Sequence, residues 1–217
     1  HWLSKGPGGL RGRAEMHAAR CGTENEAAQE KEQARTDWES IVRARSKELR
    51  KGGRMVIVSF SKSPEGYFLG QTDSGASMWD SFQTAWDRLA TEGLIDEEER
   101  LAVSFPSYYR TAQESEEGAR RIPGIKIVSV EERIVRCPYR RAWTLGSSGR
   151  SPREHAEWFV PTTRSWSEST FKNALKDKRD KEAVMKKFWS NYVDLVADEP
   201  ASHGMDYVHS YLVLEKE

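Results

Sequence analysis

The sequence predicts an α/β protein in which three β-strands alternate with groups of helices. Three segments indicate the strands: a short apolar run at residues 55–60, and two later segments, IKIVSVEERIVRC and MDYVHSYLVLEK, in which apolar and polar residues alternate. The intervals between them carry apolar residues at helical spacing. Because these intervals are long for simple crossovers, we expect extra helices above the sheet as a cap.

The clearest predicted helix follows the polar run ENEAAQEKEQARTD. Its stripe recurs at spacings of three and four and comprises Trp38, Ile41, Val42, Arg45 and Leu49. The pair Gly52 and Gly53 is predicted to end the helix after its basic last turn, KELRK. The strand at 55–60 should follow at once, and its mostly apolar residues predict burial on both faces of the sheet.

After a loop over 61–76, a second apolar stripe predicts a helix that Gly93 closes. Its residues are Met78, Trp79, Phe82, Trp86, Leu89 and Ala90. The segment IDEEERLAV predicts a further short helix, and TAQESEEGARR another, with Thr111 as N-cap and Glu114 completing a capping box. The tract SFPSYYR between them is too aromatic for an ordinary solvent loop.

In the last third of the chain, TLGSSGRSP has the composition of a linker, and helices are predicted over 153–175 and 180–196. The sequence shows no internal repeat. Its 217 residues are enough for one domain or one and a half.

Composition and charge exclude several classes of partner. The chain has 34 Lys plus Arg and 34 Asp plus Glu, so no overall field draws it to nucleic acid or an anionic membrane. No run approaches the roughly 20 apolar residues of a membrane span. The two cysteines, Cys21 and Cys137, form no CxxC pair, which fits a reducing compartment. We therefore expect a cytoplasmic protein that binds neither nucleic acid nor membrane.

Most familiar catalytic patterns are missing from the sequence. The five histidines are scattered without an HExxH motif, so we expect no metal site. There is no GxSxG elbow, and neither cysteine follows a basic helix start that would activate it. The segment GPGGLRGR is better interpreted as a flexible arm than as a phosphate loop, and an RNA-binding interpretation of its arginines conflicts with the neutral charge balance.

One tract does indicate chemistry: Trp2, in HWLSK near the start of the chain. An indole N–H is a hydrogen-bond donor with no acceptor, so in a closed pocket it can hold a carboxylate while its ring excludes water. A tryptophan that is simply buried in the core could stand at the same position in the sequence. The residues alone leave both interpretations open.

Four motifs resemble, in order, those of the salicylate/benzoate/theobromine (SABATH) carboxyl methyltransferases. They are HWLSKGP, KELRKGGRMVIV at a helix-to-strand junction, DRLATEGLIDEEE, and FPSYYRTAQE with the later strand IKIVSVEE. The closing FWSNYVDLVADEPASHGMDYVHSYLVLEK also resembles the last helix and strand of the family. Agreement weakens over 11–30 and 144–192.

The resemblance implies the C-terminal part of a Rossmann-like methyltransferase sheet, namely its last three strands of seven, with a helical cap. The implied segments are the end of the core at 1–60, a first cap part at 61–124, and a core strand at 125–143. A linker with a second cap part at 144–192 would follow, and then the last helix end and an edge strand at 193–217. The glycine-rich cofactor turn and its acidic ribose ligand would lie upstream of His1, so the 217 residues alone would be inactive.

The activity implied is methylation of a small-molecule carboxylate with S-adenosylmethionine as cofactor, by a protein that could form a homodimer. By position, eight residues match the family's substrate site: His1, Trp2, Met78, Trp79, Tyr108, Thr163, Trp166 and Tyr207. Methyl transfer to a carboxylate already ionised at neutral pH requires no general base, so no catalytic residue is expected. Methylation of a purine ring nitrogen, and a non-catalytic small-molecule binding module, are the alternatives.

Overall fold

The computed structural model describes residues 2–5, 16, 24–70 and 77–217, with side chains of the first helix from residue 27 onward. His1, Cys21 and the GPGGLRGR arm lie outside the described residues. The elements follow one another as α1 (Glu24–Ser46), β1 (Arg54–Phe60), α2 (Met78–Thr91), α3 (Glu97–Ala102), α4 (Ala112–Arg120), β2 (Ile125–Val135), α5 (Pro138–Thr144), α6 (Pro152–Ala174), α7 (Lys181–Asp198) and β3 (Tyr207–Lys216). The predicted α/β class is confirmed.

The described strands form one sheet in the order β1-β3-β2, with β3 antiparallel to both neighbours. On one side Val58 pairs with Tyr211, which on the other side pairs with Glu131. The register of β2 shifts between Ile127 and Ser129, so the strand carries a bulge there. We expected an edge strand at the end of the chain, and this is wrong. The alternating pattern of β3 reports which of its faces is buried, not its place in the sheet.

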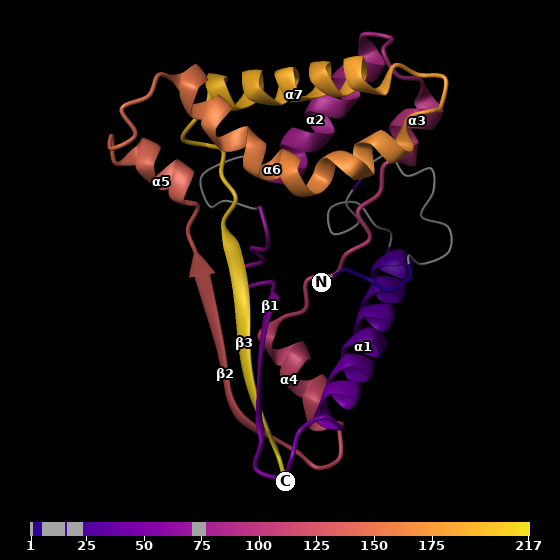
Figure 1. Ribbon diagram of the computed structural model, residues 1–217, viewed down its shortest axis with the longest axis vertical. Coiled ribbons are helices and arrows are strands. Elements are labelled where there is room, and N and C mark those ends of the chain that lie inside the picture. The colour runs from indigo at the N-terminus through magenta and orange to yellow at the C-terminus, as the bar shows by residue number, and fades with distance from the viewer. Residues whose placement is uncertain (1, 6–15, 17–23, 71–76) are drawn as a thin grey trace.

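Helices α1 and α4 cover one face of the sheet (Figure 1). Their contact depends on Trp38, whose Nε1 donates to the Ser115 carbonyl at 2.9 Å. Gly118 permits this close approach, because a Cβ there would lie 2.6 Å from Trp38 Cδ1. Below the two helices lie Leu212 and Leu214 of β3, both buried.

The remaining helices gather at one end of the sheet in a separate layer (Figure 1). Its core is strongly aromatic: the rings of Phe171 and Phe188 have centroids 4.4 Å apart, and Trp86 packs 5.2 Å from Phe171. Capping boxes start α2, α3, α4 and α6, which confirms the predicted pair Thr111 and Glu114. None of the described helices is long and apolar enough to cross a membrane.

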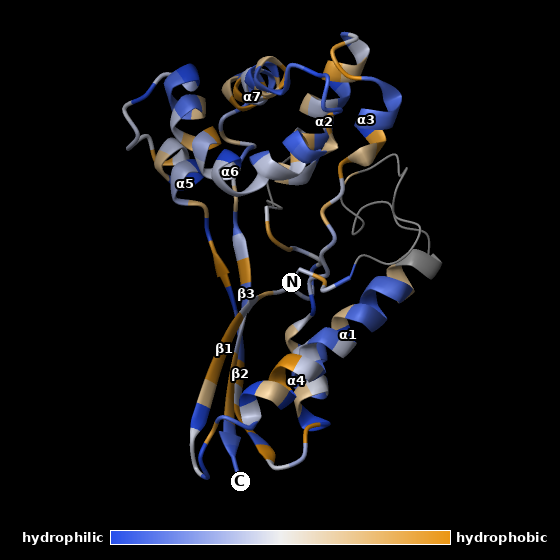
Figure 2. Cartoon of the chain, turned by 45° about the vertical axis from the view of Figure 1, so that its right-hand side comes forward, coloured by the Kyte–Doolittle hydropathy of each residue, from blue (hydrophilic) through white to orange (hydrophobic). Residues whose placement is uncertain are grey.

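The prediction that β1 is buried on both faces is wrong. Val56 and Val58 are 65% and 51% exposed, and Figure 2 shows β1 mostly in hydrophobic colours. The cause is that α1 and α4 cover the opposite face, where Met55 and Ile57 pack.

Three further details differ from expectation. Helix α1 ends at Ser46, because the amides of Lys47 and Glu48 bond three residues back and tighten the chain into turns. Helix α4 packs on the strands β2 and β3 of the sheet. It falls in the range 61–124, which we expected to form the first part of the cap. Helix α5 occupies the end of the range 125–143, where we expected only a strand, and continues to Thr144.

Candidate active site

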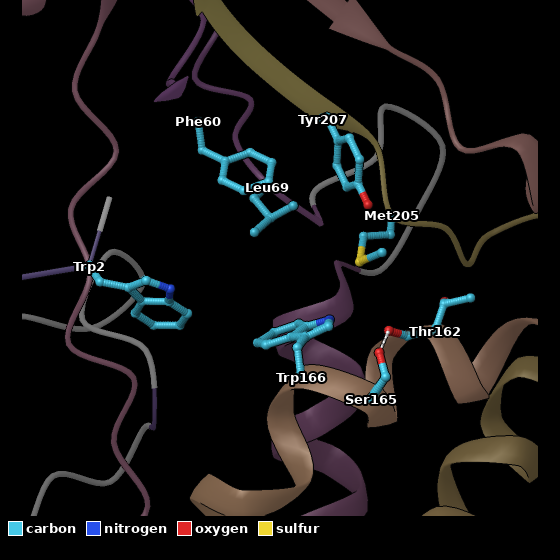
Figure 3. Close-up of a pocket in the computed structure, with 8 residues that line it drawn as sticks. All are labelled: Trp2, Phe60, Leu69, Thr162, Ser165, Trp166, Met205 and Tyr207. Atoms are coloured by element: carbon cyan, nitrogen blue, oxygen red, sulfur yellow. Dashed lines mark hydrogen bonds between the residues drawn. The ribbon is translucent and has the colours of Figure 1, made fainter. Parts of the chain in front are cut away.

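A pocket of about 450 Å³ opens where the helical layer meets the end of the sheet. Its lining comes from five places in the chain: the first residues, the end of β1, the loop after β1, helix α6, and the start of β3 with the residues just before it. The residues that line it are Trp2, Phe60, Leu69, Thr162, Ser165, Trp166, Met205 and Tyr207 (Figure 3).

The pocket wall is apolar and aromatic, and none of its lining residues carries a charge. The hydroxyls of Thr162 and Ser165 donate to the carbonyls of Phe159 and Thr162, at 2.7 and 3.0 Å. These hydroxyl oxygens are therefore left to act as acceptors. Donors come from elsewhere: Figure 3 shows the indole of Trp2 directed into the pocket and the Tyr207 hydroxyl pointing toward Met205.

Burial raises the pKa of Tyr207 above its ordinary value, so its hydroxyl remains protonated at neutral pH and can donate a hydrogen bond. The ring packs edge-on against Phe60, with centroids 5.3 Å apart.

The start of β3 is fixed by a buried ion pair. Asp206, next to Tyr207, accepts hydrogen bonds from the Arg140 guanidinium at 2.6 Å and from the Cys137 amide at 2.8 Å. Its backbone carbonyl also accepts from the Gly70 amide at 3.1 Å, beside Leu69. Asp206 thus holds the segment of Met205 and Tyr207 in two ways: its carboxylate fixes it to the start of α5, and its backbone carbonyl fixes it to the segment of Leu69.

Three of the predicted site residues line this pocket, namely Trp2, Trp166 and Tyr207. The indole rings of Trp2 and Trp166 have centroids 6.5 Å apart and are inclined by 51°. Segments far apart in the sequence therefore share one wall.

Three others lie buried behind the pocket wall. Met78 and Trp79 belong to the core of the helical layer, where Trp79 donates through Nε1 to the carbonyl of Leu69 at 3.1 Å. Thr163 is buried and donates its hydroxyl to the Val160 carbonyl at 2.8 Å. Its neighbour Thr162 faces the pocket instead.

The structure does not bring Tyr108 to this pocket. Its hydroxyl donates to Glu114 at 3.0 Å, and its ring lines a second cleft of about 250 Å³ between α1 and α4. His1 lies outside the described residues.

Five pocket residues are not singled out by the sequence. They are Phe60, Leu69, Thr162, Ser165 and Met205. A signal exists for two of them, because Thr162, Ser165 and Trp166 are spaced i, i+3 and i+4 and so share one helical face. Among the described residues, no group of His, Cys, Asp or Glu could hold a metal ion.

Comparison with solved structures identifies the class of fold. A loganic acid methyltransferase with SAH superposes with a TM-score of 0.72 at 20% identity, over 100% of this chain and 59% of that chain. This likeness confirms that the three-stranded sheet and its helices have a methyltransferase fold.

Comparison of sequences identifies the family. The model for SAM dependent carboxyl methyltransferases matches residues 1–217, so the chain belongs to this family. Indole-3-acetate O-methyltransferase 1 of Oryza sativa subsp. japonica is 32% identical over 123 residues, which are 52% of this chain and 30% of the rice enzyme. Gibberellic acid methyltransferase 1 of Arabidopsis thaliana is 32% identical over 108 residues, 48% of this chain and 28% of that enzyme. The matched part thus spans about a third of these relatives.

Proposed function

We propose that this chain forms the acceptor-binding part of an S-adenosylmethionine-dependent enzyme that methylates the carboxylate of a small organic acid. The observation that carries the proposal is an uncharged aromatic pocket with the Trp2 indole directed into it (Figure 3). A neutral N–H donor can hold a carboxylate by a hydrogen bond. A positively charged partner would form an ion pair with the carboxylate and make it a weaker nucleophile. Trp166 and Tyr207 then form the walls around the body of the acid.

The reaction requires orientation more than acid-base chemistry. A carboxylate with a pKa of about 4 is ionised at neutral pH, so it attacks a methyl group in line with no proton to remove. A pocket that excludes water and fixes the direction of attack can supply much of the rate, since effective molarities reach about 10⁵ M or more. We propose that the helical layer of α2, α3 and α5–α7 acts as a cap for this purpose.

S-adenosylmethionine, when bound, supplies the electrophilic methyl group. The pocket described above does not fit the whole cofactor, because none of its lining residues is charged and the cofactor's amino-acid end needs polar partners. We therefore assign this pocket to the acceptor alone and propose that residues other than its lining hold the cofactor.

The residues behind the wall support it in this proposal. Trp79 fixes Leu69 through its hydrogen bond to the Leu69 carbonyl, while Met78 and Thr163 fill the core next to it. His1, which precedes Trp2 in the sequence, remains a proposed substrate-binding residue. A cytoplasmic location and a homodimer also remain proposals, the first supported by the cysteine pattern and the second by the family resemblance.

The test is transfer of a labelled methyl group from S-adenosylmethionine by the full natural protein. We expect transfer to at least one acid in a panel that includes indole-3-acetate and gibberellic acid. Transfer to purine nitrogens alone would favour N-methylation. Binding of an acid without any transfer would favour a non-catalytic binding module, and the absence of both would refute the proposal.

A further inference from the structure

The position of Trp2 depends on its backbone more than on the packing of its side chain. The residue is 50% exposed, and its ring lies 6.4 Å from Phe105 and 6.5 Å from Trp166, measured between centroids. On one side the segment forms an antiparallel bridge between Trp2 and Ser107, and the Leu3 amide donates to the Pro106 carbonyl at 3.2 Å. One flank of this short segment is therefore attached to the FPSYYR tract.

The other flank is attached to Asp37 of α1. The Ser4 amide donates to Asp37 Oδ2 at 2.8 Å, and the Ser4 hydroxyl donates to Oδ1 at 2.6 Å. Both carboxylate oxygens of Asp37 thus accept hydrogen bonds from Ser4, which lies two positions after Trp2. Gln33, one turn earlier on α1, donates to Asp37 Oδ1 at 2.9 Å and orients the carboxylate.

Asp37 is a rigid anchor because the helix around it is fixed. Its neighbour Trp38 is buried and bonded to Ser115 of α4, and the Arg110 guanidinium lies 4.7 Å from the Trp38 ring centroid. Burial alone would raise the pKa of Asp37, but hydrogen bonds from Ser4 and Gln33 outweigh it and lower that pKa. The side chain is therefore an ionised, strong acceptor at neutral pH.

We propose that Asp37 is a positioning residue, which acts through Ser4 to aim the Trp2 indole at the acceptor carboxylate. With this anchor removed, Ser4 keeps only the longer hydrogen bond that its hydroxyl accepts from Gln33 Nε2 at 3.2 Å, so residues 2–4 are held mainly at the FPSYYR tract and we expect the indole to change its orientation with its backbone. The functional part of this inference rests on the proposed role of Trp2. The structural part, that Asp37 fixes Trp2, can be tested without any substrate.

The structural test uses ¹⁹F NMR of the 217-residue chain labelled with 5-fluorotryptophan. The Trp2 resonance is identified by its loss in Trp2→Phe. In Asp37→Ala we expect this resonance to shift and to sharpen as the ring gains freedom, while the resonance of Trp38 on the same helix stays in place. Glu39→Gln on the same helix is the matched control, because it removes ion pairs to Arg35 of α1 and to Arg121 at the end of α4 and leaves Ser4 untouched.

An unchanged Trp2 resonance in a folded Asp37→Ala chain would overturn the inference. So would an equal shift in Glu39→Gln, since that would show a general loosening of α1. If Asp37→Ala does not fold, Ser4→Ala removes one of the two hydrogen bonds and must produce a smaller change of the same kind.

The functional test is a double-mutant cycle read by calorimetry with indole-3-acetate as the probe acid. We expect Asp37→Ala to weaken binding about tenfold in the wild-type background and by less than about twofold in Trp2→Phe, because both changes remove one coupled unit. Asp37→Asn, which keeps an acceptor for the Ser4 amide, should recover part of the affinity. Equal losses in both backgrounds would show that Asp37 does not act through Trp2. If the wild type does not bind indole-3-acetate, the cycle is run with an acid of the panel that it does bind; if it binds none of them, the proposed function fails while the NMR result still decides the structural inference.

Discussion

The indole rings of Trp2 and Trp166 meet at a centroid distance of 6.5 Å, although one lies at the start of the chain and the other in the middle of α6. The contact joins the segment at residues 2–4, which pairs with the FPSYYR tract at Ser107, to the helical layer. The contact places the indole N–H donor of Trp2 and the ring of Trp166 on the wall of one cavity. One ring comes from the segment at residues 2–4 and the other from the helical layer. The properties of this cavity depend on how well both rings are held.

Trp2→Phe keeps an aromatic ring and removes the N–H donor. A hydrogen bond to a charged group contributes about 1.5–3 kcal/mol, so we expect the affinity for indole-3-acetate to fall about 10- to 100-fold. Calorimetry with the methyl ester of the same acid is the control, because its binding should change much less. An equal loss for acid and ester would show that Trp2 contributes only its ring.

Replacing Asp206 tests the buried ion pair that fixes the start of β3. Asp206→Ala leaves the Arg140 guanidinium buried without this partner, a change that costs about 3–5 kcal/mol. The free energy of unfolding in urea measures the loss. The control Asp194→Ala breaks an exposed pair with Arg153 and should cost at most about 1 kcal/mol. Similar losses in the two variants would contradict this account of Asp206.

Gly118→Ala tests the contact between α1 and α4. Alanine is favoured over glycine in helices by about 1 kcal/mol, yet its Cβ would lie 2.6 Å from Trp38 Cδ1. We expect a net loss of about 1–3 kcal/mol in the free energy of unfolding. In a Trp38→Phe background the smaller ring makes room, so the same change should cost less. A stabilised Gly118→Ala single variant would be inconsistent with the close approach.

His155 predicts a specific pH dependence of stability. Its imidazole is fully buried between Trp143 and Trp158, and neither ring nitrogen has a hydrogen-bond partner among the described residues. Burial lowers the pKa of His155, so the folded state favours the neutral ring. The unfolded chain takes up a proton near pH 6.5, and stability present above that pH is therefore lost as the pH falls toward the lower folded pKa.

The variant His155→Phe should remove part of this acid sensitivity. We expect a smaller difference between the free energies of unfolding at pH 7.5 and pH 5 than in the wild type. A residual difference is expected from His203 and His209, since burial also lowers the pKa of each. If the pH dependence of His155→Phe matched that of the wild type, His155 would not be buried in its neutral form.

The sequence is sufficient to predict the order of every described element except α5, because their signals are local. Thr111 and Glu114 mark the start of α4 with a capping box, and the stripe from Met78 to Leu89 marks the buried face of α2. Sheet order is not local. β3 lies between β1 and β2 because it pairs with strands that are far from it in the sequence. The alternation of apolar and polar residues within β3 does not indicate which strands it pairs with.

The pocket was predictable only in part, for a similar reason. Trp2, Trp166 and Tyr207 were predicted because they match, by position, the substrate site of the family that the sequence resembles. Leu69 and Met205 carry no such signal, and they meet because the Gly70 amide donates to the backbone carbonyl of Asp206, a contact that any residue at position 206 could make. Met78 and Trp79 are residue types that often line pockets, but their positions on α2 place them on the buried face of the helix, in the core.

The most direct test of the central claim is a crystal structure of the protein with indole-3-acetate bound. We predict that a carboxylate oxygen lies 2.7–3.2 Å from the indole nitrogen of Trp2, with the ring of the acid between Trp166 and Tyr207. A carboxylate bound instead beside Arg110 in the cleft between α1 and α4, or an acid in this pocket with its carboxylate directed away from Trp2, would contradict the account.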